Sequence, residues 1–209
     1  MFIRGLLVLL ASLSFVFGGD SAVYQNDFEQ AEPGKVPFDM LVLDGNFSVK
    51  ADATNRFLEL PGAPLDSFSL QFGPAETNGL SVSAMIRSTT KSRRFPTFGL
   101  GLYGVAGFKV QISPAKKSLE VYKDQALIAS APFEWKSGEW TVLKLRAHPA
   151  AGDSWKIEAK AWTQGDPEPS TWLVSSEHKP ESPLSGRASL VGSPFSGTPI
   201  QFDNLKVEP

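Results

Sequence analysis

The sequence predicts an all-β protein, folded as a sandwich of short antiparallel strands, and three observations lead to this prediction. Beyond the first twenty residues, no long segment repeats its apolar residues at the three- and four-residue spacing of a helix. Apolar and polar residues alternate instead in many short runs, which indicates strands with one buried face. Turn-forming glycine and proline residues end these runs at short intervals, as is typical of sandwiches and jelly rolls.

Each alternating run corresponds to one expected strand. The expected strands are 47–51, 57–60, 68–72, 80–87, 98–103, 108–113, 119–122, 126–131, 140–147, 154–163, 187–191 and 200–207. Two hairpins are expected among them: 119–122 with 126–131, and 140–147 with 154–163. Prolines exclude segments 166–169 and 179–183 from central strands, because proline cannot donate a hydrogen bond to the ladder.

Composition limits the class of protein further. The chain has 209 residues, no cysteine and a formal net charge of −2. Residues 19–209 suit one domain, because all-β sandwiches commonly reach about 200 residues as single units. A chain of this length buries about 70% of its unfolded surface and therefore needs no disulfides. Its slightly acidic balance argues against general nucleic-acid binding, which normally needs a strong basic excess.

Residues 1–18 predict a secretory signal peptide. Arg4 supplies the positive charge, residues 6–17 are apolar or small, and Val16 and Gly18 suit the positions before the cleavage site. Cleavage is expected after Gly18, with Ala22 as the alternative. The apolar run is shorter than the ~20 residues of a spanning helix, so an uncleaved membrane anchor is less favoured. Export without cysteine fits a secreted or periplasmic bacterial protein better than a small eukaryotic ectodomain, which disulfides usually stabilise. No membrane span is expected after cleavage.

Four short motifs are spread along the chain. They are Asp27-Phe28-Glu29 with Gly34 and Pro37, residues 79–84, the segment 135–145 with its two tryptophans, and residues 186–190 followed by Phe202-Asp203-Asn204. Together they resemble the concanavalin A-like jelly-roll superfamily, in particular its laminin G-like and related secreted bacterial domains. This resemblance implies an antiparallel jelly-roll β-sandwich, in a superfamily whose members often bind carbohydrate.

The same resemblance brings an enzymatic alternative. Glucanases of the superfamily carry a Glu-x-Asp-x-Glu motif on one strand, and this motif does not occur in the sequence. The nearest acidic pair, Glu120 and Asp124, is four residues apart and ends in an expected turn, which is unsuitable for two carboxylates that flank a sugar bond. No catalytic residue is therefore nominated, and a divergent glycoside hydrolase or lyase is the less favoured interpretation.

A structural calcium ion is the one cofactor that the resemblance suggests. Related modules often join the first strand to the last through a cation, and Glu29 and Asp203, with Asp27 nearby, supply the carboxylate oxygens that calcium prefers. The alternative is that Glu29 and Asp203 only cap strand ends or turns. A zinc site is not expected, because His148 and His178 lie in separate loops and cysteine is absent.

The candidate ligand site is a polar strand face in the hairpin 140–163. Leu143 and Leu145 would point inward there, so that the alternating cationic and tryptophan side chains would point outward. Gly99 and Gly101 would leave an open floor on a nearby strand. Assuming the same alternation on the neighbouring strands, the expected ligand-binding residues are Arg87, Tyr103, Lys109, Lys144, Arg146, Lys160 and Trp162, with Gln111 beside them.

Such a face would stack a sugar ring on an aromatic side chain and pair its cations with sulfate or uronate groups. The alternative is an ordinary solvated outer face, since exposed lysines also prevent strand association. The basic loop with Arg93, Arg94 and Phe95 is a second candidate for contact with an anionic ligand or surface. The sequence thus predicts an exported, non-catalytic carbohydrate-binding module, with an anionic polysaccharide or glycan as partner. The alternative is a structural or protein-interaction domain of the bacterial cell envelope.

Overall fold

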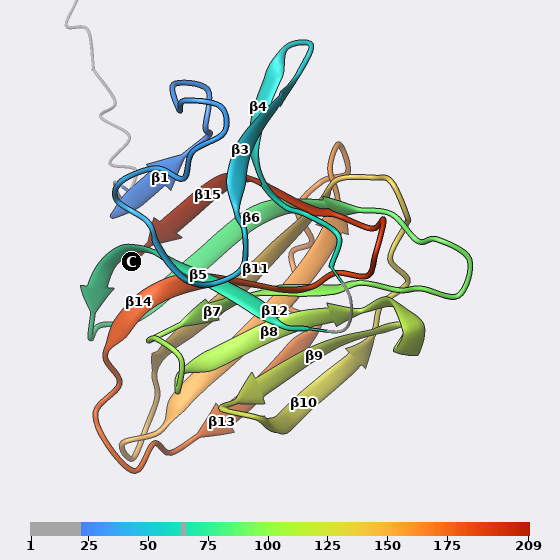
Figure 1. Cartoon of the computed structure of the whole chain (residues 1–209). Coiled ribbons are helices and arrows are strands. Elements are labelled where there is room, and N and C mark those ends of the chain that lie inside the picture. The colour runs from blue at the N-terminus through green and yellow to red at the C-terminus, as the bar shows by residue number, and fades with distance from the viewer. Residues whose placement is uncertain (1–21, 64–65) are drawn as a thin grey trace, which may run out of the picture.

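The computed structural model describes residues 22–63 and 66–209, which form a sandwich of two stacked antiparallel β-sheets (Figure 1). The predicted signal peptide, residues 1–18, lies outside the described residues. Within them, no helix has the length and apolar content that a membrane-spanning helix needs. A short 3₁₀ helix, η1 (Pro114–Lys116), joins two strands of the second sheet.

The first sheet has eight strands. Its order is β13 (Val174–His178), β12 (Trp155–Thr163), β11 (Thr141–Pro149), β6 (Leu80–Ser88), β15 (Ile200–Glu208), β4 (Asn55–Leu60) and β3 (Ser48–Asp52), with β1 (Tyr24–Asn26) also paired to β15. The C-terminal strand β15 therefore lies inside the sheet, and it joins the two ends of the described chain because β1 pairs with it.

The second sheet has seven strands. Its order is β10 (Ala126–Pro132), β9 (Ser118–Lys123), β8 (Phe108–Ser113), β7 (Thr97–Leu102), β14 (Gly186–Ser193), β5 (Phe68–Glu76) and β2 (Leu41–Asp44). Consecutive strands β7 to β10 form a meander, whereas β14 enters between β7 and β5 from the far end of the sequence. The crossing of distant segments between two layers is the jelly-roll arrangement.

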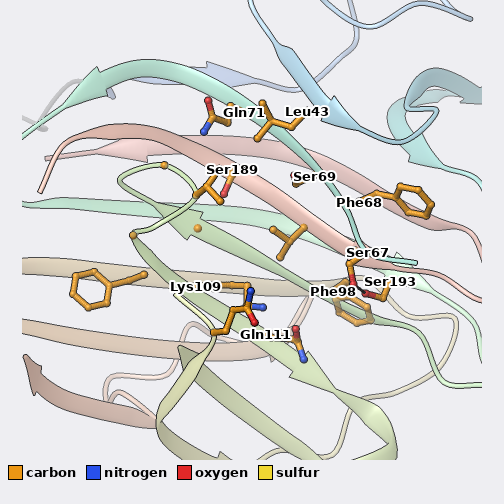
Figure 2. A pocket seen from close by; sticks show the side chains of 18 of the residues that line it. Leu43, Ser67, Phe68, Ser69, Gln71, Phe98, Lys109, Gln111, Ser189 and Ser193 are labelled. Carbon is orange, nitrogen blue, oxygen red and sulfur yellow. Dashed lines mark hydrogen bonds between the residues drawn. The ribbon is translucent and has the colours of Figure 1, made fainter. Parts of the chain in front are cut away.

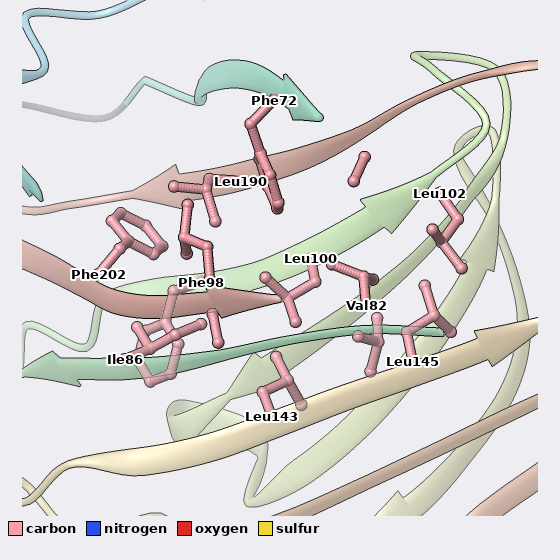
Figure 3. Close-up of a cluster of buried hydrophobic side chains, with 14 of the residues drawn as sticks. Phe72, Val82, Ile86, Phe98, Leu100, Leu102, Leu143, Leu145, Leu190 and Phe202 are labelled. Atoms are coloured by element: carbon pink, nitrogen blue, oxygen red, sulfur yellow. The ribbon is translucent and has the colours of Figure 1, made fainter. Parts of the chain in front are cut away.

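The hydrophobic core lies between the two sheets, because each strand turns alternate apolar side chains inward. Leu143 and Leu145 of the first sheet and Leu100 and Leu190 of the second are completely buried there (Figure 3). The predicted hairpin is formed by β11 and β12, and Leu143 and Leu145 point inward as predicted. Its other face is consequently polar.

The structure contains strands that the alternating pattern does not reveal. Strands β1, β2 and β13 are short. Apolar and polar residues alternate too little in them for the sequence to reveal a strand. Strand β5 also continues to Glu76, past the Gly73-Pro74 pair at which we expected it to end. Gly73 has a φ of +68°, which glycine adopts easily, and the pairing with β14 shifts register in this region.

Candidate functional site

A cavity of about 440 Å³ opens on the outer face of the seven-stranded sheet. We call it the sheet cavity, and its central strands are β5, β14, β7 and β8. Figure 2 shows Gln71, Ser189, Lys109 and Gln111, which come from three of these strands and line the cavity. Ser69 of β5 adds another hydroxyl. Amide, hydroxyl and ammonium groups thus converge on one hollow, and Asp124, paired with Lys123 at 3.0 Å, adds a carboxylate to its lining.

The hollow exists because of a glycine. Gly101 of β7 pairs with Ser189 of β14 on one side and with Lys109 of β8 on the other, so it lies between these two polar residues. A Cβ atom at this position would lie 2.4 Å from Ser189 Oγ. Any larger residue would therefore fill the space between these two polar side chains. Of the two glycines predicted to leave an open floor, Gly101 lines the cavity. Gly99 does not, because a Cβ atom there would lie 1.9 Å from the Val110 carbonyl oxygen.

The loop between β7 and β8 forms one wall of the cavity. Tyr103 and Gly104 both adopt positive φ angles, +64° and +75°, and they turn the chain so that Gly104 and Val105 line the cavity. Tyr103 itself is buried, and its hydroxyl donates a hydrogen bond to the Asn78 carbonyl at 2.6 Å. Burial raises the pKa of this phenol. The expectation that Tyr103 presents its ring on a polar face is wrong: it anchors the loop from inside.

Lys109 is the cation of the sheet cavity. Its ammonium lies 4.7 Å from the centre of the Tyr122 ring, and no carboxylate in the described part of the chain forms an ion pair with it. Burial lowers the pKa of Lys109, against the opposing effect of the nearby Glu120 charge. A half-buried ammonium without an ion-pair partner can accept an anionic group of a ligand.

A buried carboxylate organises the side chains next to Lys109. Glu120 is 3% exposed and receives hydrogen bonds from four donors: Ser113 Oγ at 2.6 Å, Tyr122 Oη at 2.6 Å, Lys116 Nζ at 3.0 Å and Ser118 Oγ at 3.1 Å. Burial alone would raise the pKa of Glu120, but these hydrogen bonds outweigh it and hold the value at about 2. Gln111 donates in turn to Ser113 Oγ at 3.0 Å, so this network also orients the amide in the cavity.

The first sheet carries Lys144, Arg146 and Lys160 on one outer face, and other side chains of the chain bind all three. Lys144 and Lys160 stand directly opposite each other on β11 and β12, which would be repulsive without a shared anion. Glu168, from the loop after β12, supplies that anion at 3.5 Å and 2.8 Å respectively. Its hydrogen bond with Lys160 is the main cause of the lowered pKa of Glu168.

Trp172 packs against Arg146 and Lys160 on the same face. Its ring lies 4.6 Å from both the Arg146 guanidinium carbon and the Lys160 ammonium nitrogen. Arg146 also binds Glu158 through two hydrogen bonds, at 2.5 Å and 3.1 Å, and Lys160 Nζ donates to the Pro169 carbonyl. The cations that we expected to meet a ligand are therefore held by residues of the chain itself. Trp162 lies beside them, with its ring 5.9 Å from Lys160 Nζ.

Arg87 lies on the same sheet but is held separately. Its guanidinium stacks on Trp140 at 4.6 Å, and its Nε donates to Gln201 Oε1 at 2.7 Å. It also pairs with Asp52 at 3.2 Å. These contacts fix Arg87 on the outer face of the first sheet.

The structure consequently divides the predicted ligand-binding set. Arg87, Lys144, Arg146, Lys160 and Trp162 lie on the outer face of the eight-stranded sheet, whereas Lys109 and Gln111 lie on the opposite outer face of the sandwich. The alternation is as predicted in β8 and β11, whereas Tyr103, just past the end of β7, departs from it and is buried. The assignment of strands to one sheet is not as predicted, because alternation does not show which sheet a strand joins. Ser69, Gln71 and Ser189 were missed, since short polar residues in strands also occur on ordinary solvated faces.

Of the three acidic residues suggested for calcium, Asp203 lies on β15, whereas Asp27 and Glu29 follow β1. Asp203 is 2% exposed and accepts hydrogen bonds from Asn55 Nδ2 at 3.0 Å and from the Asn204 amide at 2.6 Å. Burial raises the pKa of Asp203, and the charges of Glu29 and Asp27 raise it further. Carboxylate oxygens of this kind fit a hard cation.

The capping alternative is also visible at the same place. Glu29 accepts a hydrogen bond from the Arg56 amide at 2.9 Å, at the beginning of β4. Among residues 22–63 and 66–209, no group of three or more His, Cys, Asp or Glu side chains is arranged to hold a metal ion. Glu29 thus caps the beginning of β4, whereas Asp203 lies inside β15, at its register shift, and accepts hydrogen bonds from Asn55 and Asn204.

Solved structures with the same architecture are numerous. The carbohydrate-binding module CBM66 from Bacillus subtilis aligns with a TM-score of 0.56 and 11% identity, over 82% of this chain and 96% of the module. The metal-free carbohydrate recognition domain of Emp46p aligns with a TM-score of 0.62 and 13% identity, over 91% of this chain and 98% of that domain. The fold is the concanavalin A-like jelly roll. No protein-family model and no curated protein sequence matches the chain.

A third similar structure is the exoplasmic/lumenal domain of VIP36 in its form bound to Ca²⁺ and Man3GlcNAc. It aligns with a TM-score of 0.50 and 10% identity, over 81% of this chain and 87% of that domain. At identities this low, the likeness concerns the fold, and the ligand site must be argued from the side chains of this chain.

Proposed function

We propose that this protein binds carbohydrate without catalysis, in the sheet cavity on the seven-stranded sheet. The observation that carries the proposal is the convergence of Gln71, Ser189, Lys109 and Gln111 around the glycine floor at Gly101. Amides, hydroxyls and an ammonium are the donors and acceptors that match the hydroxyl groups of a sugar. The similar folds are those of a carbohydrate-binding module and of lectin recognition domains, which agrees with the proposal.

We further propose that the preferred ligand carries negative charge. Lys109 has no ion-pair partner among the described residues, and its burial makes an unpaired charge costly. A uronate or sulfate group would provide the missing partner and would remove this cost. A neutral glycan would leave the Lys109 charge unpaired and its energetic cost unchanged.

The proposal is tested by binding of residues 19–209 to neutral, uronic and sulfated polysaccharides, measured by calorimetry. We expect binding to the acidic polymers, and we expect Lys109→Ala with Gln111→Ala to abolish it. The matched control is Lys144→Ala, which removes the same charge from the opposite sheet. Binding that survives loss of Lys109 and Gln111, but not loss of Lys144, would place the site on the other face.

Export is a further part of the proposal, since polysaccharides of this kind lie outside the cytoplasm. It rests on the signal peptide predicted for residues 1–18. Expression of the full chain in a bacterium, followed by N-terminal sequencing of the extracellular or periplasmic product, is expected to give a first residue of Gly19. A start at Val23 would assign cleavage to Ala22, and an intact Met1 would contradict export with cleavage.

A second candidate function is contact with a cell-envelope protein. Phe38 is 103% exposed, and Leu41 and Leu43 are exposed on the edge strand β2. Large apolar side chains on an edge strand favour pairing with another chain. A pull-down from envelope extract with the native protein and with Phe38→Ser/Leu41→Ser would test it, and an unchanged set of captured proteins would remove this candidate.

A further inference from the structure

A second cavity adjoins the sheet cavity. It has a volume of about 440 Å³ and shares three lining residues with the first: Ser67, Thr97 and Ser193. Ser67 Oγ and Ser193 Oγ are 2.6 Å apart and form a hydrogen bond at the boundary between the two cavities. The two cavities therefore form a continuous track along the outer face of the sheet.

The track is longer than a single sugar ring. Lys109 pairs with Gly101 on β7, and Thr97 at the start of that strand lies four residues earlier. At a rise of about 3.3 Å per residue, the distance along the strand is ~13 Å. The second cavity begins at Thr97 and continues to Phe95. A ligand that fills both cavities must therefore be a chain of several sugars.

Aromatic side chains line the far cavity. Phe95 and Phe195, both half-buried, contribute to its walls together with Pro194. Half-buried aromatic rings provide apolar surface on which the faces of sugar rings stack. The far cavity thus adds stacking surface at its own end of the track, whereas the sheet cavity combines its polar groups with apolar side chains such as Leu43 and Phe68.

The far end of the track also carries a cluster of cations. Residues 91–94 form a tight turn, in which the Arg94 amide donates to the Lys91 carbonyl at 3.1 Å and Ser92 has a φ of +59°. Arg94 Nη1 reaches the Ser196 carbonyl at 3.4 Å, and this contact places the turn beside the Phe195 wall. We call Lys91, Arg93 and Arg94 the basic turn.

The basic turn has no neutralising partner. All three side chains are exposed, and in the part of the chain that the structure describes none of them forms an ion pair. Asp66 is the acidic residue that lines the far cavity, and it accepts a hydrogen bond from the Ser67 amide. This contrasts with the other sheet, where Glu158 and Glu168 hold the cations.

We infer that the ligand is an acidic polysaccharide and that the protein binds internal sugars of the polymer, not its terminal sugar. One acidic sugar would lie at Lys109 and another at the basic turn. This inference rests on the proposed function and deepens it, because it assigns the length and charge spacing of the ligand. Two separated cationic points joined by polar and aromatic surface select a chain with repeated negative charge. A single terminal sugar would reach only one of these points.

The test measures affinity for oligogalacturonates of increasing length, with uncharged mannan oligomers as the comparison. We expect affinity to rise with length until the oligomer spans both cavities, and then to level off. In the Arg93→Ala/Arg94→Ala variant, the long oligomers are expected to bind about tenfold more weakly, the effect of losing two exposed ion pairs. The shortest oligomers, which reach only Lys109, should bind this variant normally.

The matched control is Lys35→Ala/Lys136→Ala, which removes two exposed lysines elsewhere, with side chains 68% and 59% exposed. If both double variants bind long oligomers equally, while Lys109→Ala abolishes binding, the proposed function stands and the extended track is wrong. If no oligomer binds the native protein, both fail. Equal competition by single-stranded DNA would overturn the polysaccharide assignment, because it would indicate a surface that attracts any polyanion.

Discussion

The Lys109 ammonium lies 4.7 Å from the centre of the Tyr122 ring, and the Tyr122 hydroxyl donates a hydrogen bond to Glu120 at 2.6 Å. The Tyr122 ring thus lies between two opposite charges, the Lys109 ammonium on β8 and the Glu120 carboxylate on β9. The carboxylate is satisfied by its own donors, the ring bears its electron-rich face toward the cation, and the ammonium remains available to the cavity. This relationship explains how a lysine can stay charged and unpaired on a half-buried face.

The first prediction concerns the pH dependence of ligand binding. The pKa of Lys109 is lowered by burial, so its ammonium loses the proton at a lower pH than an exposed lysine does. We expect binding of polygalacturonate to weaken as the pH rises through this pKa. Lys109→Arg should keep its charge and bind independently of pH up to 10.5. Calorimetric titrations of both proteins between pH 6 and pH 10.5 would check this, and parallel pH profiles would contradict it.

The second prediction concerns acid stability. The pKa of Glu120 is about 2 in the folded protein and near 4.5 when unperturbed, so the stability that its charge contributes is present above pH 4.5. That contribution is lost as the pH falls from 4.5 toward 2. Glu120→Gln should lower the free energy of unfolding at pH 7 by about 2 kcal/mol, since it weakens hydrogen bonds to a charged group. Denaturant unfolding at several pH values should show the two proteins converging near pH 2.

The third prediction tests the glycine floor. Gly101→Ala places a Cβ atom 2.4 Å from Ser189 Oγ, so the hydroxyl must rotate and the cavity becomes shallower. We expect ligand affinity to fall, with a small loss of thermal stability. In the Gly101→Ala/Ser189→Ala protein the contact with Oγ is relieved and stability should recover. Affinity should stay low, because the cavity is still filled and the Ser189 hydroxyl is also absent. Recovery of both together would show that the alanine acts only through strain.

The fourth prediction separates the two faces of the sandwich. Lys160 is 6% exposed and bound by Glu168, so Lys160→Ala leaves a carboxylate without its main partner. We expect the variant to lose about 2 kcal/mol of stability, or roughly 5 °C in Tm, and to bind polysaccharide normally. Lys109→Ala should behave in the opposite way, with lost binding and a Tm at or above that of the native protein, because it removes a half-buried charge. Thermal melting and calorimetry on both variants would decide the matter.

The fold follows from the sequence because alternation reports local burial directly. Leu143 and Leu145 are inward, and Lys144 is outward, as the pattern in the hairpin requires. The site depends on information that alternation lacks. Nothing in residues 98–113 indicates that β7 and β8 belong to the sheet opposite β11, and this pairing decides that Lys109 and Lys144 lie on different faces.

Covering segments are a second reason why the site could not be predicted. Glu168 and Trp172 lie in a proline-rich loop, and only the folded chain shows that this loop returns to Lys160 and Arg146. Tyr103 is similar: it follows the alternation of β7 but has a φ of +64°, which turns its ring into the core. Local pattern does not encode such reversals unless glycine or asparagine marks them.

The fifth prediction concerns a cation at Asp203. Burial and the neighbouring charges of Glu29 and Asp27 raise the pKa of this carboxyl, so its ionised form destabilises the folded protein at neutral pH. A bound calcium ion would relieve this repulsion. We therefore expect calcium to raise Tm at pH 7, and a chelator to reverse the effect.

Asp203→Asn separates the ion from the strand-capping alternative. The variant removes the buried charge, while its side-chain oxygen can still accept the hydrogen bond from the Asn204 amide. Without calcium it should melt at or above the Tm of the native protein, since the repulsion from Glu29 and Asp27 is gone. With calcium it should show no further rise. The calcium prediction would be wrong if neither calcium nor chelator changed the native Tm and elemental analysis found no calcium. Glu29 and Asp203 would then serve only as caps of strand ends or turns.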